Sequence, residues 1–181
     1  MQAEVSLPTG LVDDFREAMR RLASTVVMVT THLDERPWGL TVSACCSVSM
    51  SPPSLLVSLG AHTASAGAIT AAQRFGVSVL GEAQHHVARV GSRAGEPKFV
   101  AEYCDSTAEC QTPAVAGALA HLDCAVSRRV DVADHVLFVG EVDRVVLRPG
   151  EDRPLVFYAR DFHRLHDDSV QGMEGLLYPP W

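Results

Sequence analysis

The sequence predicts one mostly β domain, an antiparallel barrel with a few α-helices on its periphery. About six or seven short segments are rich in β-branched residues or alternate apolar and polar residues with a period of two, which is typical of strands. Few helical segments interrupt them, and this scarcity of strand–helix–strand alternation favours antiparallel pairing. The length of 181 residues suits a single domain. A doubly wound parallel sheet is the alternative.

The first predicted element is a helix over residues 11–24, packed outside the barrel. Leu11, Phe15, Met19 and Leu22 recur at helical spacing, so they share one face. Thr9 is placed to cap the start of this helix.

The predicted strands follow in order, separated by turns and by two further helices. A turn over residues 34–37 separates the first two strands, and Pro52 and Pro53 end the second, because proline cannot donate to a sheet ladder. Helices are expected over residues 63–74 and 82–90, a loop over 92–97 and a turn over 131–135. Strands are expected over residues 25–31, 38–50, 54–59, 75–80, 122–127, 136–142 and 154–158. In the fifth of these strands, Leu122, Cys124 and Val126 alternate with Asp123, Ala125 and Ser127.

Composition excludes several classes of protein. The 15 basic and 22 acidic residues give a net charge of −7, which argues against nucleic acid as a partner. No segment approaches the roughly 18 apolar residues of a membrane span, and the first residues do not resemble a signal peptide. The 5 cysteines are an odd number without a C-x-x-C pair, so we expect free thiols. These features predict a cytoplasmic protein without a membrane partner.

Common catalytic and metal-binding motifs are missing from the sequence. It contains no G-x-S-x-G, P-loop, H-E-x-x-H or G-x-G-x-x-G motif. His85 and His86 are adjacent, and neighbouring side chains on a helix diverge by about 100°, so they cannot chelate one metal together. Cys104 and Cys110 are expected to be ordinary thiols. We therefore predict no metal site.

Residues 39–53 hold an unusual number of small and hydroxyl side chains for a buried strand. Small residues let a planar ligand approach the backbone, whose N–H groups can bind its carbonyls and ring nitrogens. The alternative is a half-exposed strand that turns its Ser and Thr side chains outward.

Several ordered motifs resemble the short-chain flavin reductases, which are the reductase components of two-component flavin-dependent monooxygenases. They are Gly39-Leu40-Thr41-Val42-Ser43, Ser47-Val48-Ser49-Met50-Ser51-Pro52-Pro53, Leu55-Leu56-Val57-Ser58-Leu59, Arg74-Phe75-Gly76-Val77-Ser78-Val79-Leu80, Lys98-Phe99, Ala133-Asp134-His135, Phe138-Val139-Gly140-Glu141-Val142 and Pro154-Leu155-Val156-Phe157-Tyr158. The resemblance covers roughly residues 12–165. It implies an antiparallel Greek-key split β-barrel of the FMN-binding type over residues 11–166, between an N-terminal extension (1–10) and a C-terminal tail (167–181) that is either a docking arm or a disordered end.

The resemblance also assigns a flavin site and a nicotinamide site. A helix N-terminus at residues 64–65 suits a phosphate. His135 matches a nicotinamide contact and is the predicted catalytic residue. Phe157, Tyr158, Ala159 and Arg160 match the rest of the pyridine-nucleotide site, although this chain carries its arginine one position later than the usual Tyr-Arg-Gly-x-Tyr. The residues expected to bind flavin are Pro37, Trp38, Gly39, Leu40, Thr41, Ser43, Ala44 and Cys45 along the isoalloxazine, Ser58, Leu59, Gly60, Ala64 and Ser65 at the ribityl and phosphate groups, and Arg89, Val90, Lys98 and Phe99 toward the phosphate or adenine.

The activity implied is that of an NAD(P)H:flavin oxidoreductase of the EC 1.5.1 type. It would transfer hydride from NADH, favoured over NADPH, to exchangeable FAD or FMN, and would supply reduced flavin to a separate monooxygenase, with secondary metabolism as one setting. The missing acid–base triad suits this reaction, because the cofactors carry the chemistry. Relatives build the flavin site at a subunit interface, so a homodimer is expected. The alternatives are a non-catalytic flavin- or haem-binding split barrel and an oxidase of the pyridoxamine-phosphate type, which would need a more basic pocket.

Overall fold

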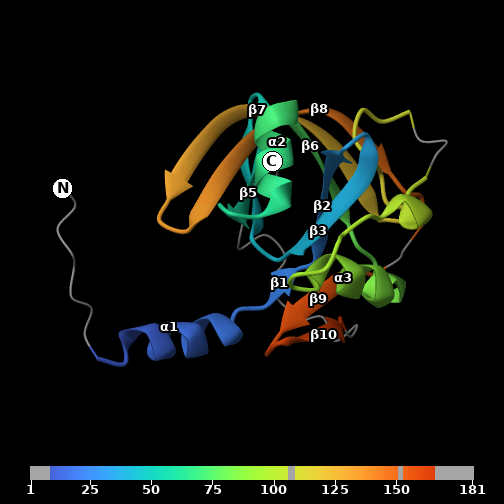
Figure 1. Cartoon of the computed structure of the whole chain (residues 1–181). Helices are drawn as coiled ribbons and strands as arrows, with labels where there is room; N and C mark the ends of the chain where they lie inside the picture. Colours follow the sequence, from blue (N-terminus) through green and yellow to red (C-terminus); the bar gives the residue numbers. More distant parts are fainter. Residues whose placement is uncertain (1–8, 106–108, 151–152, 166–181) are drawn as a thin grey trace.

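The computed structural model describes residues 9–105, 109–150 and 153–165 (Figure 1). Every strand pairing in these residues is antiparallel, which confirms that part of the prediction. The helices are α1 (Leu11–Arg20), α2 (Ala64–Ala72) and α3 (His85–Ser92), with 3₁₀ turns at Glu82–Gln84 and Ala101–Tyr103. The strands are β1 (Ser24–Thr25), β2 (Val27–Leu33), β3 (Arg36–Val42), β4 (Cys45–Met50), β5 (Pro53–Gly60), β6 (Arg74–Val79), β7 (Ala120–Val132), β8 (His135–Leu147), β9 (Leu155–Tyr158) and β10 (Asp161–Arg164).

The main sheet is an open barrel of seven strands in the order β3-β2-β6-β7-β8-β5-β4. In the described part of the chain no pairing joins its two edge strands, β3 and β4, so the barrel is split as predicted. In Figure 1, α2 lies in front of the sheet, between the β7–β8 hairpin and the β2–β3 hairpin. It packs against β2, β3, β5 and β6.

The barrel interior is filled by the inward side chains of alternating strands. On β5 the residues Leu55, Val57 and Leu59 are buried, whereas the residues between them are half-buried on the other face. The two largest core residues, Phe75 and Phe138, belong to β6 and β8 and are fully buried. This packing needs a glycine at position 140, because a Cβ there would lie 2.6 Å from the Phe75 ring.

A smaller three-stranded sheet, β1-β9-β10, adjoins the barrel and was not predicted. Three backbone hydrogen bonds connect it to the barrel: Val26 N–H to the Leu155 carbonyl (3.1 Å), Leu155 N–H to the Leu80 carbonyl (2.8 Å) and Leu80 N–H to the Val26 carbonyl (3.1 Å). The same three residues belong to a second buried apolar cluster that also contains Met28 and Val87. The small sheet and strand β2 of the barrel therefore pack on this second cluster, which is separate from the core inside the barrel.

Several predicted boundaries are wrong in detail. The expected strand over residues 38–50 is two strands, because the chain leaves the ladder at Ser43 and Ala44 between β3 and β4. The helix expected over residues 63–74 is shorter, since the Thr63 hydroxyl caps α2 by accepting from Ala66 N–H at 3.2 Å. Strand β10 was missed. The N-terminal extension, apart from residues 9 and 10, and the tail over residues 167–181 lie outside the described residues.

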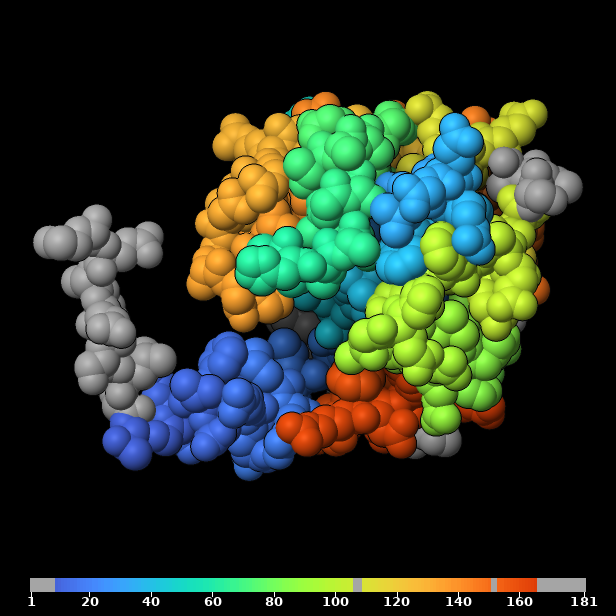
Figure 2. Space-filling view, viewed as in Figure 1, coloured from blue at the N-terminus to red at the C-terminus, as the bar shows by residue number. Residues whose placement is uncertain are grey.

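Helix α1 corrects two expectations. It ends at Arg20, and Gly10 occupies its N-cap with no side-chain hydrogen bond, so Thr9 is not the cap. None of its residues is buried, and Phe15 is 60% exposed. Figures 1 and 2 show α1 extending away from the body of the molecule. The expectation that it packs on the barrel is therefore wrong, because a helical period identifies an apolar face without identifying what covers it.

No helix in residues 9–105, 109–150 and 153–165 is long and apolar enough to cross a membrane.

Candidate functional site

A cleft of about 510 Å³ lies where β3, the start of α2 and the segment before residue 100 meet. These three segments border one another on the face shown in Figure 2. Trp38 and Leu40 share one face of β3 because alternate residues of a strand point the same way. The free edge of β3 is hydrogen-bonded to residues 98–100. Gly39 N–H donates to the Lys98 carbonyl and Val100 N–H donates to the Pro37 carbonyl, both at 3.0 Å. The lining residues are Trp38, Leu40, His62, Thr63, Ala64, Ser65, Gly95, Glu96, Pro97, Lys98 and Phe99.

An aromatic wall lines this cleft. The Trp38 side chain is held by its indole N–H, which donates to the Ser65 hydroxyl at 2.9 Å. The Phe99 ring lies edge-on to Trp38, with centroids 5.0 Å apart and planes at 88°. Trp38 is buried and Phe99 is half-buried, and the hydrogen bond to Ser65 holds the Trp38 side of the wall in place.

Beside this wall, the cleft meets the N-terminus of α2. The first N–H groups of a helix have no intrahelical acceptor, so those of Ala64 and Ser65 are available to an anion. The helix dipole adds a partial positive charge at the same place. The Lys98 ammonium lines the cleft and donates to the carbonyls of Arg93 and Glu96. This end of the cleft can bind a phosphate.

The other end of β3 leads to two further clefts. Thr41 and Ser43 line a cleft of about 120 Å³ together with Phe157 and Phe162. Ser43 and Phe157 also line a cleft of about 410 Å³ that contains Ala159 and Arg160 of the β9–β10 turn. The structure therefore places two of the predicted isoalloxazine residues beside the predicted nicotinamide stretch.

The β9–β10 turn has a strained backbone. Its central residues Ala159 and Arg160 have φ values of 50° and 70°, the left-handed region usually taken by Asn or Gly. Such residues cost of order 1–3 kcal/mol each unless their surroundings hold them in place. Tyr158, which precedes them, is exposed beside His163.

Some predicted flavin contacts are limited to the backbone. Leu59 is 1% exposed in the barrel core. A Cβ on Gly39 would lie 2.6 Å from the Met28 sulfur, so the side-chain position of Gly39 faces the interior. The Thr41 hydroxyl donates to the Ala88 carbonyl at 2.8 Å and so retains only its acceptor capacity.

Three further predicted flavin residues, Ser58, Arg89 and Val90, lie on β5 and α3. Ser58 is half-buried and its N–H donates to the Ala44 carbonyl at 3.0 Å. Arg89 is exposed on α3, and Val90 packs against the second apolar cluster. Neither of these two lines the three clefts described above.

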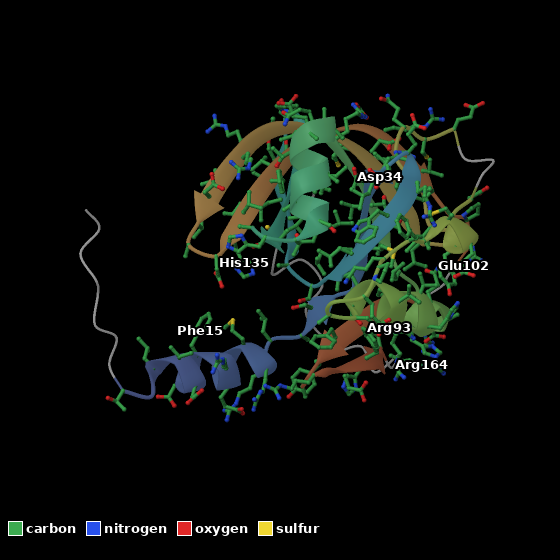
Figure 3. The ribbon with its side chains drawn as sticks, in the orientation of Figure 1. Phe15, Asp34, Arg93, Glu102, His135 and Arg164 are labelled. Atoms are coloured by element: carbon green, nitrogen blue, oxygen red, sulfur yellow. The ribbon has the colours of Figure 1, made fainter. Side chains whose placement is uncertain are left out.

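His135 begins β8, directly after the β7–β8 turn. Its Nδ1 atom lies 2.8 Å from an Asp134 carboxylate oxygen, and this hydrogen bond is the main reason that the pKa of Asp134 is lowered. Gly60 pairs with His135, and Ala61 N–H donates to the Asp134 carbonyl at 2.9 Å, so the turn lies against the loop that enters α2. Figure 3 shows His135 well separated from Arg164 of the small sheet.

Sequence reasoning missed a buried polar network behind the barrel wall. His121 Nδ1 lies 2.8 Å from the Ser78 hydroxyl, and its Nε2 lies 3.0 Å from the Thr112 hydroxyl, which donates to Asp123. Asp123 also accepts from Gln111 N–H and Thr112 N–H, each at 2.9 Å. Asp123 is fully buried, so it does not face solvent as its place in the strand alternation suggested.

At this network, the side chains of Cys110, His121 and Asp123 each offer an atom that could ligate a metal ion, and these three atoms lie within 4.8 Å of one another. The Thr112 hydroxyl lies between the imidazole and the carboxylate and hydrogen-bonds to both. The arrangement is therefore that of a hydrogen-bonded network. Two polar residues at alternate positions of β7, His121 and Asp123, were the available sequence signal.

An open antiparallel barrel with a helix N-terminus beside an aromatic wall defines a class of nucleotide-binding protein that can hold an elongated, phosphate-bearing planar ligand. The chain belongs to the flavin reductase family, because residues 19–166 match the flavin reductase like domain. The family expected from the sequence is thereby confirmed.

Named relatives resemble this chain over most of its length. It is 33% identical over 181 residues to an NADH-dependent FAD reductase of Streptomyces globisporus, covering 95% of this chain and 98% of that protein. It is 33% identical over 158 residues to HsaB, the reductase subunit of a flavin-dependent monooxygenase of Mycobacterium tuberculosis, covering 86% and 83%. The solved Streptomyces globisporus C-1027 NADH:FAD oxidoreductase SgcE6, in complex with NAD and FAD fragments, superposes with a TM-score of 0.79 at 30% identity and covers 91% of this chain and 98% of that one.

Proposed function

We propose that this protein is an NAD(P)H:flavin oxidoreductase of the EC 1.5.1 type that uses NADH to reduce free FAD or FMN and passes the reduced flavin to a separate flavin-dependent monooxygenase. The observation that carries this proposal is the succession of clefts along β3. One end of that strand lies at the α2 N-terminus, and the other lies beside Phe157. The names of the relatives support the choice of NADH and flavin as substrates.

The reaction requires positioning more than acid–base chemistry. A hydride passes from C4 of the reduced nicotinamide to N5 of the flavin, and a proton from solvent completes the reduction, so NAD⁺ and reduced flavin are the products. Thr41 and Ser43 would lie along the isoalloxazine, and Ala64 and Ser65 would bind the phosphate through their N–H groups. Phe157 would pack against the nicotinamide and hold the two rings in register.

We propose a homodimer with the flavin site near its interface. An isolated helix of 10 residues is marginal in water, and no residue of α1 is buried against the described part of the chain. His135 is also separated from Arg164 of the small sheet within one chain (Figure 3). A two-fold related copy would cover α1 and could bring the β7–β8 turn of one protomer to the small sheet of the other.

We place this reaction in the cytoplasm. All five cysteines are free thiols. Unpaired cysteines, including the neighbours Cys45 and Cys46, are typical of proteins that work in a reducing compartment.

NADH oxidation with added flavin tests the proposed activity. The purified protein should oxidise NADH when FAD or FMN is present and should be nearly inactive without added flavin. If the protein bound flavin but did not oxidise NADH, the proposed activity would be wrong and the protein would be a non-catalytic flavin-binding split barrel.

A pair of variants at Ala64 tests the phosphate site. Ala64→Asp places a carboxylate at the first turn of α2, where it favours the helix but repels a phosphate. Ala64→Asn has nearly the same shape without the charge. We expect the Asp variant to weaken FMN binding about tenfold relative to the Asn variant, whereas riboflavin, which lacks the phosphate, should bind both equally. Equal FMN affinity in the two variants would show that the phosphate does not bind at the N-terminus of α2.

A further inference from the structure

Arg36 and Phe99 form a stacked pair at the end of the first cleft. The guanidinium carbon of Arg36 lies 3.7 Å from the centroid of the Phe99 ring. Phe99 lines the cleft and meets Trp38 edge-on. Arg36 is exposed, and within the described residues no carboxylate pairs with it. One face of the guanidinium plane therefore covers Phe99, and its opposite face is open to solvent.

The position of this pair along β3 is informative. Arg36, Trp38 and Leu40 point to one face of the strand. The strand rises about 3.3 Å per residue, so Arg36 lies about 13 Å from Leu40. A flavin ring beside Leu40 to Ser43, with its phosphate at α2, would end before it reached Arg36. A longer ligand that continued past this phosphate would arrive at the pair.

We propose that Arg36 and Phe99 form a stacking platform for the adenine of FAD, so that this protein binds FAD in preference to FMN. The inference rests on the proposed function, because it needs the flavin to lie along β3 with its phosphate at α2. The guanidinium is planar and weakly hydrated, and it stacks on aromatic rings and on bases. Phe99 supports Arg36 from beneath and fixes its orientation. FMN has no group that reaches this platform.

The test compares the dissociation constants of FAD and FMN, measured by equilibrium dialysis for the wild type and four variants. Arg36→Ala removes the platform, Arg36→Lys keeps the charge without the plane, and Phe99→Leu removes the supporting ring. Arg128→Ala, an exposed arginine on β7, is the matched control. We expect the wild type to bind FAD about tenfold more tightly than FMN, since stacking of one base is worth about that factor. Arg36→Ala should lose this preference with little change in FMN affinity, whereas Phe99→Leu should lose it together with part of the FMN affinity, because Phe99 also lines the flavin cleft. Arg36→Lys should keep only part of the preference.

NADH also contains adenine, so the platform could bind the adenine of FAD or that of NADH. The KM for NADH distinguishes these two ligands. With FMN as acceptor, Arg36→Ala should leave this KM unchanged, because the platform serves the flavin. A raised KM for NADH with an unchanged FAD affinity would overturn the assignment. Equal wild-type affinities for FAD and FMN, or a preference that survives Arg36→Ala, would also overturn it. If the wild type bound and reduced no flavin, the proposed function itself would fail, which is a different result from equal use of both flavins.

Discussion

Cys45 and Cys46 are adjacent residues with different environments. Burial, and then the neighbouring Cys46, raise the pKa of Cys45 to about 11, whereas Cys46 is exposed on β4. The thiolate is the reactive form, so Cys45 should be inert at neutral pH. We predict that iodoacetamide labels Cys46 in the native protein well before Cys45, as measured by peptide mass spectrometry. Urea-unfolded protein, in which both should react alike, is the control, and rapid labelling of native Cys45 would contradict the prediction.

His135 gives a second prediction at the scale of one residue. If it contacts the nicotinamide or the N5 region of the flavin, His135→Ala should reduce the rate of NADH oxidation by about tenfold or more, with a smaller change in the flavin dissociation constant. His85→Ala, an exposed histidine on α3, is the control. Unchanged activity in His135→Ala would leave His135 only as the hydrogen-bond partner of Asp134 in the turn.

Most residues of the first cleft could be predicted from motifs, but the loop residues that line it could not. Trp38, Leu40, Ser65 and Phe99 belong to stretches that resemble a known family, and the structure brings them together. His62 and Glu96 lie in loops whose course depends on the rest of the fold. Arg36 looks like an ordinary turn residue until its guanidinium is found over Phe99.

At the scale of elements, the Ser78–His121–Thr112–Asp123 network fastens the segment before β7 to the barrel. Burial lowers the pKa of His121 from its ordinary value of 6.5. Burial alone would raise the pKa of Asp123, but hydrogen bonds from Thr112 and Gln111 and the nearby His121 lower it overall. Both groups therefore bind protons more readily in the unfolded chain than in the folded one.

The sign of the pH dependence follows from these two shifts. As pH falls below about 6.5, the unfolded state takes up a proton at His121 before the folded state does, so the free energy of unfolding decreases until the folded-state pKa is passed. Asp123 adds a second loss at pH values below its ordinary pKa of 3.8. Urea denaturation between neutral pH and about pH 5 should show the first loss. His121→Asn should be less stable by about 1–3 kcal/mol at neutral pH and should show a shallower pH dependence, and an equal slope in both proteins would contradict this account.

Helix α1 carries the prediction about assembly. Phe15→Asp puts a charge at the centre of its apolar face, so it should shift the protein from dimer to monomer in sedimentation velocity at micromolar concentration. Since no residue of α1 is buried within the described residues, the melting temperature of the barrel should change little in the isolated monomer. Arg16→Ala changes the net charge by the same amount on the polar face and should remain dimeric. A monomeric wild type would refute the proposed homodimer.

At the scale of the whole molecule, the distribution of donors predicts exchangeable flavin. The site offers mainly hydroxyls and backbone N–H groups, with Lys98 as the nearby cation, and neutral hydrogen bonds contribute about 0.5–1.5 kcal/mol each. The net charge of −7 adds no general attraction for an anion. We expect a dissociation constant on the order of micromolar, about −8 kcal/mol, a nearly colourless preparation, and activity that is lost on desalting and restored by added flavin. Protein that retained stoichiometric flavin through dialysis would contradict this.

The overall fold was more predictable than its smallest parts. Period-two patterns located most strands of the barrel because each has one buried face, as on β5. Strands β1 and β10 escaped because β1 has 2 residues and β10 has 4, too few for a pattern to emerge, and the strand expected over residues 154–158, which is β9, gave no sign that it belongs to a separate sheet. The burial of Asp123 depends on a distant segment that covers it, and such coverage has no signature within β7 itself.

The three backbone hydrogen bonds among Val26, Leu80 and Leu155 have a consequence for how turnover is timed. They cross the junction between the two sheets within a buried apolar cluster, so the junction has none of the looseness of a hinge. Thr41 and Phe157, on the two sides of that junction, therefore keep a constant separation. At the proposed site, donor and acceptor would meet on a preset scaffold without a closing motion, and we expect the arrival and departure of the ligands to set the rate of the cycle.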